Sequence, residues 1–277
     1  MDTVSVKLAL SEAGVAAELL VYMLGELGYE GFLEEDSLLE AFVKAELYSQ
    51  SKLDELLALE DFKNVHLLTV QQHADQNWNA LWEESYDDVI IGQRCRVRAP
   101  FHPVRPDIEF DLLIEPRMSF GTAHHETTHM MIELLLDSEI AEKSLLDMGC
   151  GTAVLAILGR KLGACPVVAI DNDEWAVNNA KDNILLNETK DISIVFGDAS
   201  KLSLYKTDIL VANINRNILL ADLPVYDTVL NHGGLLFLSG FYEDDLSSIT
   251  EQCFSLGLIN GNVITRNKWC AAVFHKP

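Results

Sequence analysis

The chain has few basic residues and no long hydrophobic run. It carries 20 lysines and arginines among 277 residues, against 43 acidic residues, for a net charge of −23. This balance argues against a broad phosphate-binding face, so we expect no direct contact with nucleic acid. The most apolar region, around residues 144–158, is interrupted by Asp147 and glycines and ends at Arg160, which excludes a membrane span there.

The cysteines lack the pattern of a disulfide framework. There are five, an odd number without paired spacing, and Cys150 lies inside a glycine loop. Reduced thiols of this kind are typical of cytoplasmic proteins. The first residues, Met-Asp-Thr-Val-Ser-Val, also lack the basic and then apolar pattern of a signal peptide. We therefore expect a cytoplasmic protein.

The most informative segment of the chain is a glycine loop that lacks the third glycine of a dinucleotide-binding motif. Residues 145–151 read Leu-Leu-Asp-Met-Gly-Cys-Gly, and Asp171 ends the next apolar run. Such a turn lets the backbone at Gly149 and Gly151 approach a nucleotide, and the carboxylate binds ribose hydroxyls. Val154 stands where a dinucleotide fingerprint has its third glycine. S-adenosylmethionine has no pyrophosphate to seat at a helix N-terminus, so the pattern favours it over NAD. The loop alone is also compatible with glycines that merely end a buried strand.

Hydrophobic periodicity predicts a small front domain over residues 1–72. The expected elements are strands at 5–10, 29–33 and 65–70 and helices at 15–27, 38–47 and 52–59. Ser37 is the expected cap of the second helix, and Gly28 ends the first. The residues at helical spacing in the first helix are Val15, Leu19, Tyr22, Met23 and Leu27. This order predicts an α+β, ferredoxin-like domain, a split β-α-β sandwich.

A polar stretch without periodicity, residues 71–77, marks a linker, which we place at 73–85. Trp78 and Trp82 follow at a spacing of four, and we interpret them as packing anchors of the linker. The rest of the chain, residues 86–277, forms the larger domain.

The pattern of the larger domain predicts a Rossmann-like α/β sheet. After strands at 89–91, 94–99 and 109–114 and a helix at 128–136, strands at 144–148, 166–170, 192–196, 208–212 and 235–239 alternate with helical segments. This alternation predicts a doubly wound parallel sheet. Residues 262–265 and 269–275 flank a short polar turn and predict an antiparallel hairpin that closes it. A sixth parallel strand is usual in dehydrogenases, whereas the closing hairpin is typical of S-adenosylmethionine-dependent methyltransferases.

Two polar residues at strand ends are further candidates for the site. Asp198 follows the third parallel strand, where such enzymes present a carboxylate to the adenine amino group; a helix cap is the alternative. Asn213 ends the fourth strand, at the switch point where ligands bind. Its context, Asn-Ile-Asn-Arg, differs from the Asn-Pro-Pro-Tyr of nucleobase methyltransferases. We therefore expect Asn213 to orient a different amine, and no residue stands out as a general base.

The segment over residues 115–128 reads Glu-Pro-Arg-Met-Ser-Phe-Gly-Thr-Ala-His-His-Glu-Thr-Thr. It resembles the signature of the ribosomal protein L11 methyltransferase (PrmA) family, Pro-Gly-x-Ala-Phe-Gly-Thr-Gly-x-His-x-Thr-Thr. The matching residues are Pro116, Phe120, Gly121, Thr122, His125, Thr127 and Thr128. The departures are Arg117 for glycine, Ser119 for alanine and Ala123 for glycine.

This resemblance implies a substrate-recognition domain joined by a linker to a methyltransferase domain. It implies that Thr127, Gly149, Asp171 and Asn213 contact S-adenosylmethionine and that Phe120 walls the pocket. The implied substrate is ribosomal protein L11, free or bound to the ribosome, methylated on lysine, with N-terminal amines as a second class of acceptor. Residues 1–72 hold 14 acidic and 4 basic residues, so this front domain is a plausible docking face for a basic protein.

Other interpretations of the sequence stay open. Residues 125–129, His-Glu-Thr-Thr-His, match a zinc-peptidase motif, but a third ligand at regular spacing is missing and we expect His125 to precede the helix. We therefore expect no metal. The alternative functions are a methyltransferase that acts on a small molecule or RNA, and a non-catalytic protein that binds the cofactor.

Overall fold

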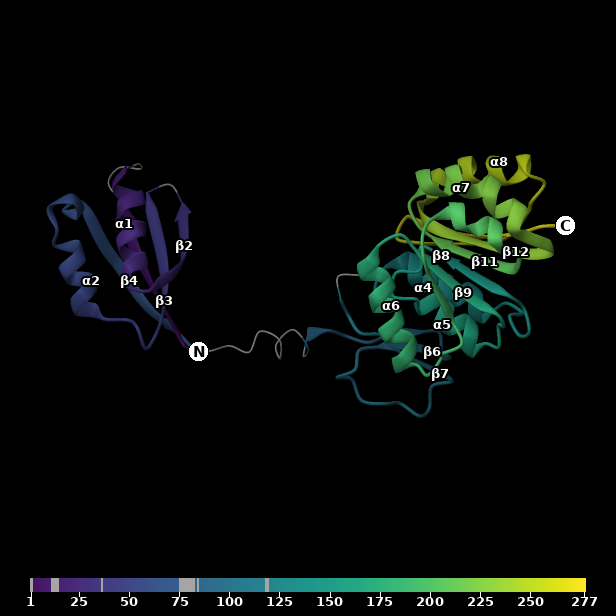
Figure 1. Ribbon diagram of the computed structural model, residues 1–277, viewed down its shortest axis with the longest axis horizontal. Helices are drawn as coiled ribbons and strands as arrows, with labels where there is room; N and C mark the ends of the chain where they lie inside the picture. The colour runs from purple at the N-terminus through teal and green to yellow at the C-terminus, as the bar shows by residue number, and fades with distance from the viewer. Residues whose placement is uncertain (1, 11–14, 36, 75–82, 84, 118–119) are drawn as a thin grey trace. The chain divides into compact units, whose positions relative to one another are not determined.

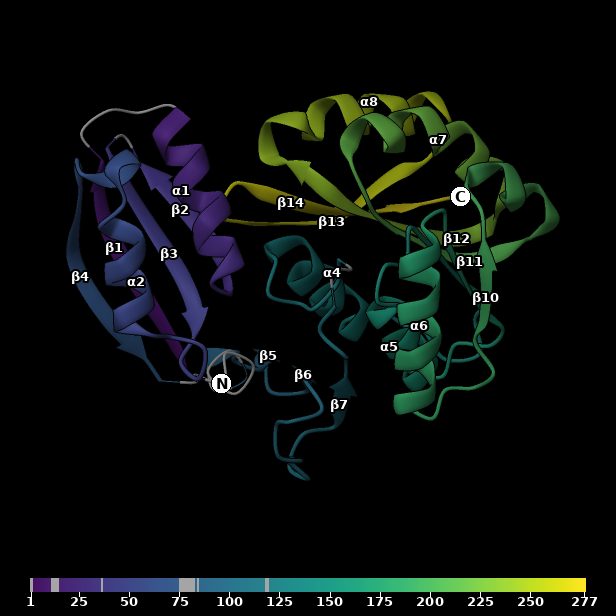
Figure 2. The same ribbon diagram turned by 60° about the vertical axis from the view of Figure 1, so that its left-hand side comes forward.

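The computed structural model describes residues 2–10, 15–35, 37–74, 83, 85–117 and 120–277. The chain forms two compact units, Met1–Tyr86 and Asp87–Pro277, drawn from two directions in Figures 1 and 2. Trp78 and Trp82, with most of the predicted linker 73–85, lie outside the described residues. Within the described residues, every helix is too short or too polar to span a membrane.

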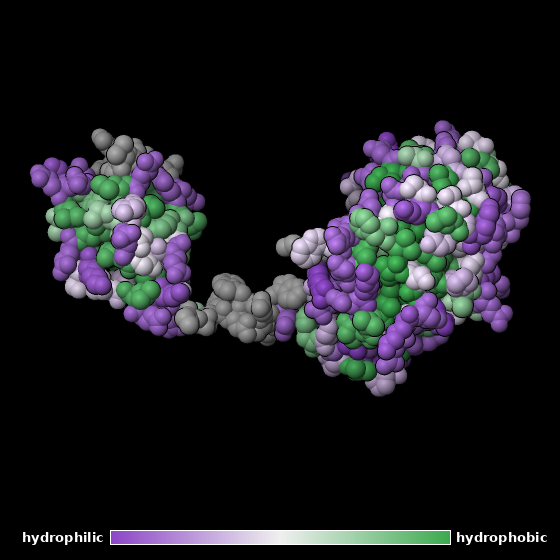
Figure 3. All heavy atoms as spheres, viewed as in Figure 1, coloured by the Kyte–Doolittle hydropathy of each residue, from purple (hydrophilic) through white to green (hydrophobic). Residues whose placement is uncertain are grey.

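The first unit is a four-stranded antiparallel sheet with two helices. Its elements are β1 (Thr3–Leu10), α1 (Val15–Glu26), β2 (Tyr29–Glu35), β3 (Leu38–Lys44), α2 (Gln50–Leu57), η1 (Glu60–Phe62) and β4 (Val65–His73). The strands lie in the order β2-β3-β1-β4. The element order β-α-β-β-α-β is that of the split β-α-β motif. Leu20 and Leu24 of α1 pack with Leu53 of α2 on the buried face of the sheet. Hydrophobic residues also lie exposed among hydrophilic ones on this unit's surface (Figure 3).

The predicted helix over 38–47, capped by Ser37, is wrong. Residues 38–44 form β3, an interior strand paired with β1 and β2. Leu39, Ala41 and Val43 point into the core, as the period of a strand requires. Leu38 and Phe42 on the opposite face make the run apolar almost throughout, and this hid the alternation.

Two further sequence predictions for this unit are corrected. In α1 the buried stripe contains Leu20 and Leu24, whereas Leu19 and Tyr22 are exposed. Nearly every residue of this helix is apolar, so spacing alone did not fix its buried face. The polar residues 71–73 continue β4, because their backbone pairs with β1 at the edge of the sheet, where polar side chains remain solvated.

The second unit begins with a small sheet, β5 (Val89–Ile91), β6 (Cys95–Arg98) and β7 (Phe110–Leu113). A seven-stranded sheet follows in the order β10-β9-β8-β11-β12-β14-β13. Its strands are β8 (Leu145–Met148), β9 (Val167–Asp171), β10 (Ser193–Phe196), β11 (Thr207–Asn213), β12 (Leu230–Tyr242), β13 (Ile259–Arg266) and β14 (Trp269–His275). Strands β8 to β12 are parallel and β14 is antiparallel to both neighbours. The predicted parallel sheet with a closing hairpin is confirmed.

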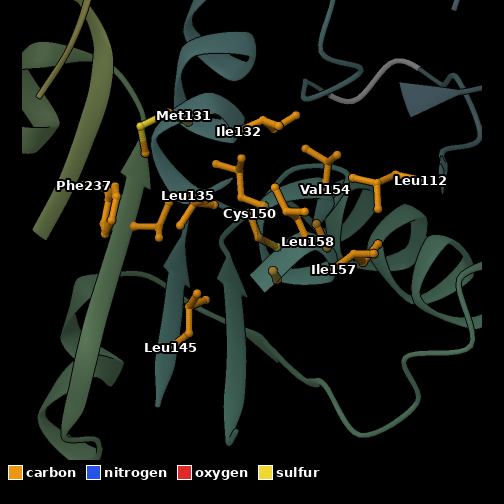
Figure 4. Close-up of a cluster of buried hydrophobic side chains, with 14 of the residues drawn as sticks. Leu112, Met131, Ile132, Leu135, Leu145, Cys150, Val154, Ile157, Leu158 and Phe237 are labelled. Carbon is orange, nitrogen blue, oxygen red and sulfur yellow. The ribbon is translucent and has the colours of Figure 1, made fainter. Parts of the chain in front are cut away.

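Helices cover both faces of this sheet. They are α4 (Glu126–Leu136), α5 (Val154–Lys161), α6 (Glu174–Leu186), α7 (Arg216–Val229) and α8 (Leu246–Ser255), with the short turns η2 (Ala199–Leu204) and η3 (Glu243–Asp245). The core on one face joins α4 and α5 to the sheet; Figure 4 shows Leu135, Leu158 and Phe237 within it. A second core packs α7 and α8 on the other face. Burial on both faces explains why β8 is apolar except at Asp147.

Candidate functional site

A cavity of about 490 Å³ lies at the carboxyl ends of β8, β9 and β11, within the size range of small-molecule sites. Every site residue predicted from the sequence except Asp198 lines it. The lining residues are Phe120, His125, Thr127, Gly149, Gly151, Asp171, Asn172, Asp173, Ala176, Asn213, Ile214, Asn215, Ile218, Gly240 and Trp269. The structure thus brings together segments from distant parts of the sequence, among them the 120–127 segment, the glycine loop, the end of β9 and the Asn213 turn.

The glycine loop needs glycine for both conformation and space. Gly149 and Gly151 have φ values of 70° and 54°. A Cβ at Gly151 would lie 2.3 Å from the Phe120 carbonyl oxygen, and one at Gly149 would lie 2.3 Å from Ile214 Cγ2. These approaches are too close for any side chain. The glycine loop is therefore packed against both the 120–127 segment and the Asn213 turn.

Asp171 is held by two backbone amides at the end of β9. Its Oδ2 accepts a hydrogen bond from Gly151 N–H at 2.8 Å, and its Oδ1 accepts one from Asp173 N–H at 3.0 Å. Each carboxylate oxygen can accept a second hydrogen bond. The carboxylate is therefore fixed at the cavity wall with capacity for two hydroxyl donors, as the ribose of an adenosine cofactor requires.

Two neighbouring groups of the glycine loop are buried behind the cavity. The pKa of Asp147 is raised to about 7: burial is the main cause, the Ala156 N–H bonded to its carboxylate opposes the shift, and the nearby Asp171 charge adds to it. Burial also raises the pKa of the Cys150 thiol well above its ordinary value. A neutral thiol is a poor nucleophile, so Cys150 serves packing.

His125 caps α4, and its ring contacts two aromatic side chains. Its Nδ1 accepts a hydrogen bond from Thr127 N–H at 3.3 Å and lies 2.8 Å from Thr127 Oγ1. The His125 ring centroid lies 5.1 Å from that of Phe120 and 4.6 Å from that of Trp269. Trp269 in turn contacts Tyr242 at 4.1 Å. Sequence reasoning missed Trp269, although an aromatic residue directly after the hairpin turn was a usable signal.

The zinc-peptidase reading does not match this geometry. His125 is the N-cap, outside the helical turn that contains His129, and its Nδ1 is already engaged with Thr127. Across the described parts of the chain, no group of three or more histidine, cysteine or acidic side chains lies close enough together to hold a metal ion.

Asn213 ends β11, and the two polar atoms of its side-chain amide have different surroundings. Its Nδ2 donates to Thr128 Oγ1 of α4 at 3.2 Å. Its Oδ1 is buried and has no hydrogen-bond partner among the described residues. Because a buried acceptor without a donor costs free energy, a ligand N–H at this point would be favoured.

Asp198 lies outside the cavity lining. Its Oδ1 accepts a hydrogen bond from Ser200 N–H at 2.9 Å and caps η2, which is the alternative role considered for this residue. Several lining residues that the sequence did not single out directly follow recognised strand ends. They are Asn172, Asp173, Ile214 and Asn215.

The structure shows the surroundings of two of the three residues that depart from the family signature. Arg117 Nη1 lies 2.7 Å from Asp182 Oδ2 of α6, in a half-exposed ion pair. Ala123, where the signature has glycine, is buried with φ of 66°, so the backbone there keeps a conformation that glycine favours. Ser119 lies outside the described residues.

Comparisons with known proteins agree with this architecture. Residues 5–277 match the family model described as ribosomal protein L11 methyltransferase (PrmA). A ribosomal protein L11 methyltransferase of Phocaeicola vulgatus is 43% identical over 255 residues, covering 91% of each chain. One from Bacteroides fragilis is 44% identical over 260 residues, covering 93% of each chain. The crystal structure of a ribosomal protein L11 methylase from Lactobacillus delbrueckii subsp. bulgaricus has a TM-score of 0.64 at 25% identity, covering 69% of this chain and 99% of that one. The chain therefore belongs to the ribosomal protein L11 methyltransferase (PrmA) family of S-adenosylmethionine-dependent protein methyltransferases.

Proposed function

We propose that the protein transfers methyl groups from S-adenosylmethionine to lysine side chains, and to the N-terminal amine, of ribosomal protein L11. The observation that carries this proposal is the match to the family over residues 5–277, together with a cavity lined by the residues its signature implies. The five free cysteines fit a reducing compartment, and we propose the cytoplasm as the site of the reaction.

The cavity suits the cofactor. Gly149 and Gly151 line it with backbone and no side chain, and Asp171 offers a fixed carboxylate to ribose hydroxyls. Thr127 and Phe120 line the same space. When bound, S-adenosylmethionine supplies an electrophilic methyl group on a positively charged sulfur. The work left to the protein is to align the acceptor, exclude water and keep the amine unprotonated.

The protein has to hold a neutral acceptor amine, whose lone pair would take the methyl group while the carbon–sulfur bonding pair stays on sulfur; the methylated ammonium would then release a proton to solvent. A lysine must first lose its proton, which costs about 4 to 5 kcal/mol at neutral pH. An apolar wall of Phe120, Trp269 and Ile214 disfavours the charged amine. We propose that Asn213 Oδ1, the buried acceptor that no described residue bonds, receives a hydrogen bond from the neutral amine and so aims the lone pair of the amine at the methyl group.

We propose that the acidic first unit docks the basic protein substrate. Residues 1–72 carry a net charge of −10, which complements a basic partner. Raising the salt concentration should therefore raise KM for ribosomal protein L11 and leave KM for S-adenosylmethionine nearly unchanged, because screening weakens attraction between separated charges. Equal salt dependence of both KM values would contradict this docking role.

The experiment that tests the function is intact-mass spectrometry of purified ribosomal protein L11 after incubation with this protein. We expect a ladder of methyl additions that requires both the protein and S-adenosylmethionine. If the cofactor binds in a parallel titration and no ladder forms, the acceptor is a different molecule, and a small amine or RNA becomes the reading to test.

The matched variant for this experiment is Asn213→Ala. It removes the proposed amine acceptor and leaves the carboxylate and glycine loop intact. We expect kcat to fall by about tenfold to a hundredfold, as for other groups that orient a reacting atom. Methylation by Asn213→Ala at the parental rate would rule out the orienting role.

A further inference from the structure

Asn183 of α6 and Asn187, the C-cap of the same helix, bind the backbone that leads into the family signature. Asn187 Oδ1 accepts from Leu113 N–H at 3.0 Å, and Asn187 Nδ2 donates to Leu113 O at 2.6 Å. One turn earlier, Asn183 Oδ1 accepts from Glu115 N–H at 2.9 Å. Both side chains are buried. These amides supply the hydrogen bonds that a neighbouring strand would otherwise give to the free edge of β7.

The spacing of the two asparagines matches the strand they bind. Residues i and i+4 of a helix lie about 6 Å apart on one face, close to the two-residue repeat of a strand. Leu113 and Glu115 are two residues apart and present their N–H groups to α6, whereas Ile114 N–H between them bonds Arg98 O of β6. The contact is therefore regular and leaves none of these three backbone donors unpaired.

Asn183 differs from Asn187 because it also reaches the glycine loop. Its Nδ2 donates to Thr152 O at 3.0 Å. Thr152, which is fully buried, donates from its N–H to Phe120 O at 3.0 Å and from its Oγ1 to Gly121 O at 2.7 Å. The Asn183 amide, whose Nδ2 also donates to Asn179 Oδ1 at 3.4 Å, thus bridges Glu115 to Thr152, and Thr152 fixes Phe120 beside Gly151.

We propose that Asn183 is a positioning residue for cofactor binding: it sets the distance between the signature segment and the glycine loop without touching the cofactor itself. The bridge requires an amide, because Glu115 N–H needs an acceptor and Thr152 O needs a donor at the same point. Asn183 does not line the cavity, so its effect on the cofactor passes through Thr152, Phe120 and Gly151. This inference rests on the proposed location of the cofactor in that cavity.

The test compares Asn183→Ala with Asn187→Ala, which removes a second buried asparagine whose side chain bonds Leu113 and the backbone carbonyl of residue 183. We would measure the dissociation constant of S-adenosylhomocysteine by calorimetry, KM for the protein acceptor, and the free energy of unfolding. We expect both variants to lose stability. The dissociation constant should rise about tenfold or more in Asn183→Ala and stay within about twofold in Asn187→Ala, since small displacements of a binding wall have large effects.

A second pair of variants keeps the inference testable if Asn183→Ala folds poorly. Asn183→Asp retains the acceptor for Glu115 but faces Thr152 O with an oxygen, and Thr152→Val removes the donor to Gly121 O. Both should weaken S-adenosylhomocysteine binding while KM for the protein acceptor stays near the parental value. Their effects should combine less than additively, because both act on the same contact.

Unchanged binding in folded Asn183→Ala or Asn183→Asp would overturn the inference, as would equal losses of affinity in Asn183→Ala and Asn187→Ala. Failure of the parental protein to bind S-adenosylhomocysteine would instead overturn the proposed cofactor site.

Discussion

Asn213 at the end of β11 is held by Thr128 in the first turn of α4: Asn213 Nδ2 donates to Thr128 Oγ1 at 3.2 Å. This hydrogen bond determines which way the amide faces and leaves Oδ1 as a buried acceptor without a partner in the described part of the chain. Helix α4 thus orients the residue proposed to receive the acceptor amine. The two residues are 85 positions apart in the sequence and meet only in the folded sheet.

Thr128→Val should lower kcat while leaving cofactor affinity nearly unchanged. Valine has the shape of threonine but cannot accept from Asn213 Nδ2, so the amide loses its fixed orientation. We expect a decrease in kcat of about tenfold, equivalent to about 1.4 kcal/mol in the barrier. Steady-state kinetics with ribosomal protein L11, together with calorimetric titration of S-adenosylhomocysteine, would separate the two parameters.

Thr128→Ser provides the matched control, because serine retains the hydroxyl. It should keep most of the parental kcat. If Thr128→Ser and Thr128→Val lose kcat equally, the methyl group or helix packing matters and the hydrogen bond to Asn213 does not.

Gly151→Ala should abolish cofactor binding, and Gly92→Ala should not. Both glycines have similar φ values, 54° and 58°, so alanine meets comparable backbone strain, about 1 to 2 kcal/mol. A Cβ at Gly151 would lie 2.3 Å from Phe120 O, whereas one at Gly92 would have no heavy atom of another described residue within 4 Å. Thermal unfolding and S-adenosylhomocysteine titration would show whether affinity is lost beyond the shared loss of stability. Comparable affinities in the two variants would contradict a tight junction between the glycine loop and Phe120.

Asp198→Ala should lower the thermal midpoint slightly and leave cofactor affinity unchanged. The Asp198 carboxylate accepts from Ser200 N–H as the cap of η2, and hydrogen bonding to the side chain and the backbone of Ser200 lowers the pKa of Asp198. Its side chain is exposed and outside the cavity lining. A clear loss of affinity for S-adenosylmethionine in a titration of this variant would favour the adenine contact that the sequence position suggests.

The parallel sheet and its site were accessible from sequence because their signals are local. Strands buried on both faces give short apolar runs, and the residues that end them, such as Gly149, Asp171 and Asn213, converge at one edge of a parallel sheet. Position along the chain was then enough to predict most of the cavity lining.

What escaped prediction depends on partners distant in sequence. β3 is a strand because β1 and β2 lie on either side of it, although its apolar run reads as a helix. Trp269 enters the site only because the closing hairpin brings it against His125. Asn183 and Asn187 look like ordinary polar positions of a helix until the edge of β7 is placed beside them.

Asp147→Asn should remove a loss of folding stability that grows as the pH rises. Burial raises the pKa of Asp147 from an ordinary value of 3.8 to about 7. A carboxyl group whose pKa is raised in the folded state contributes its stability below about pH 4 and loses it as the pH rises through about 7. The parental protein should therefore lose about 4 kcal/mol relative to Asp147→Asn across this range. Urea unfolding of both proteins at a series of pH values measures the difference.

Asp208→Asn is the control of opposite sign. Hydrogen bonds from Ser144 and Asn231 lower the pKa of Asp208, so its contribution is present above about pH 4 and is lost as the pH falls through the folded pKa. The difference in unfolding free energy between the parental protein and Asp208→Asn should thus increase from acid to neutral pH, while the difference for Asp147→Asn decreases. Parallel pH dependence in the two comparisons would mean that Asp147 is solvated or paired in the folded protein, and the glycine loop would then not enclose a neutral carboxyl behind the cofactor cavity.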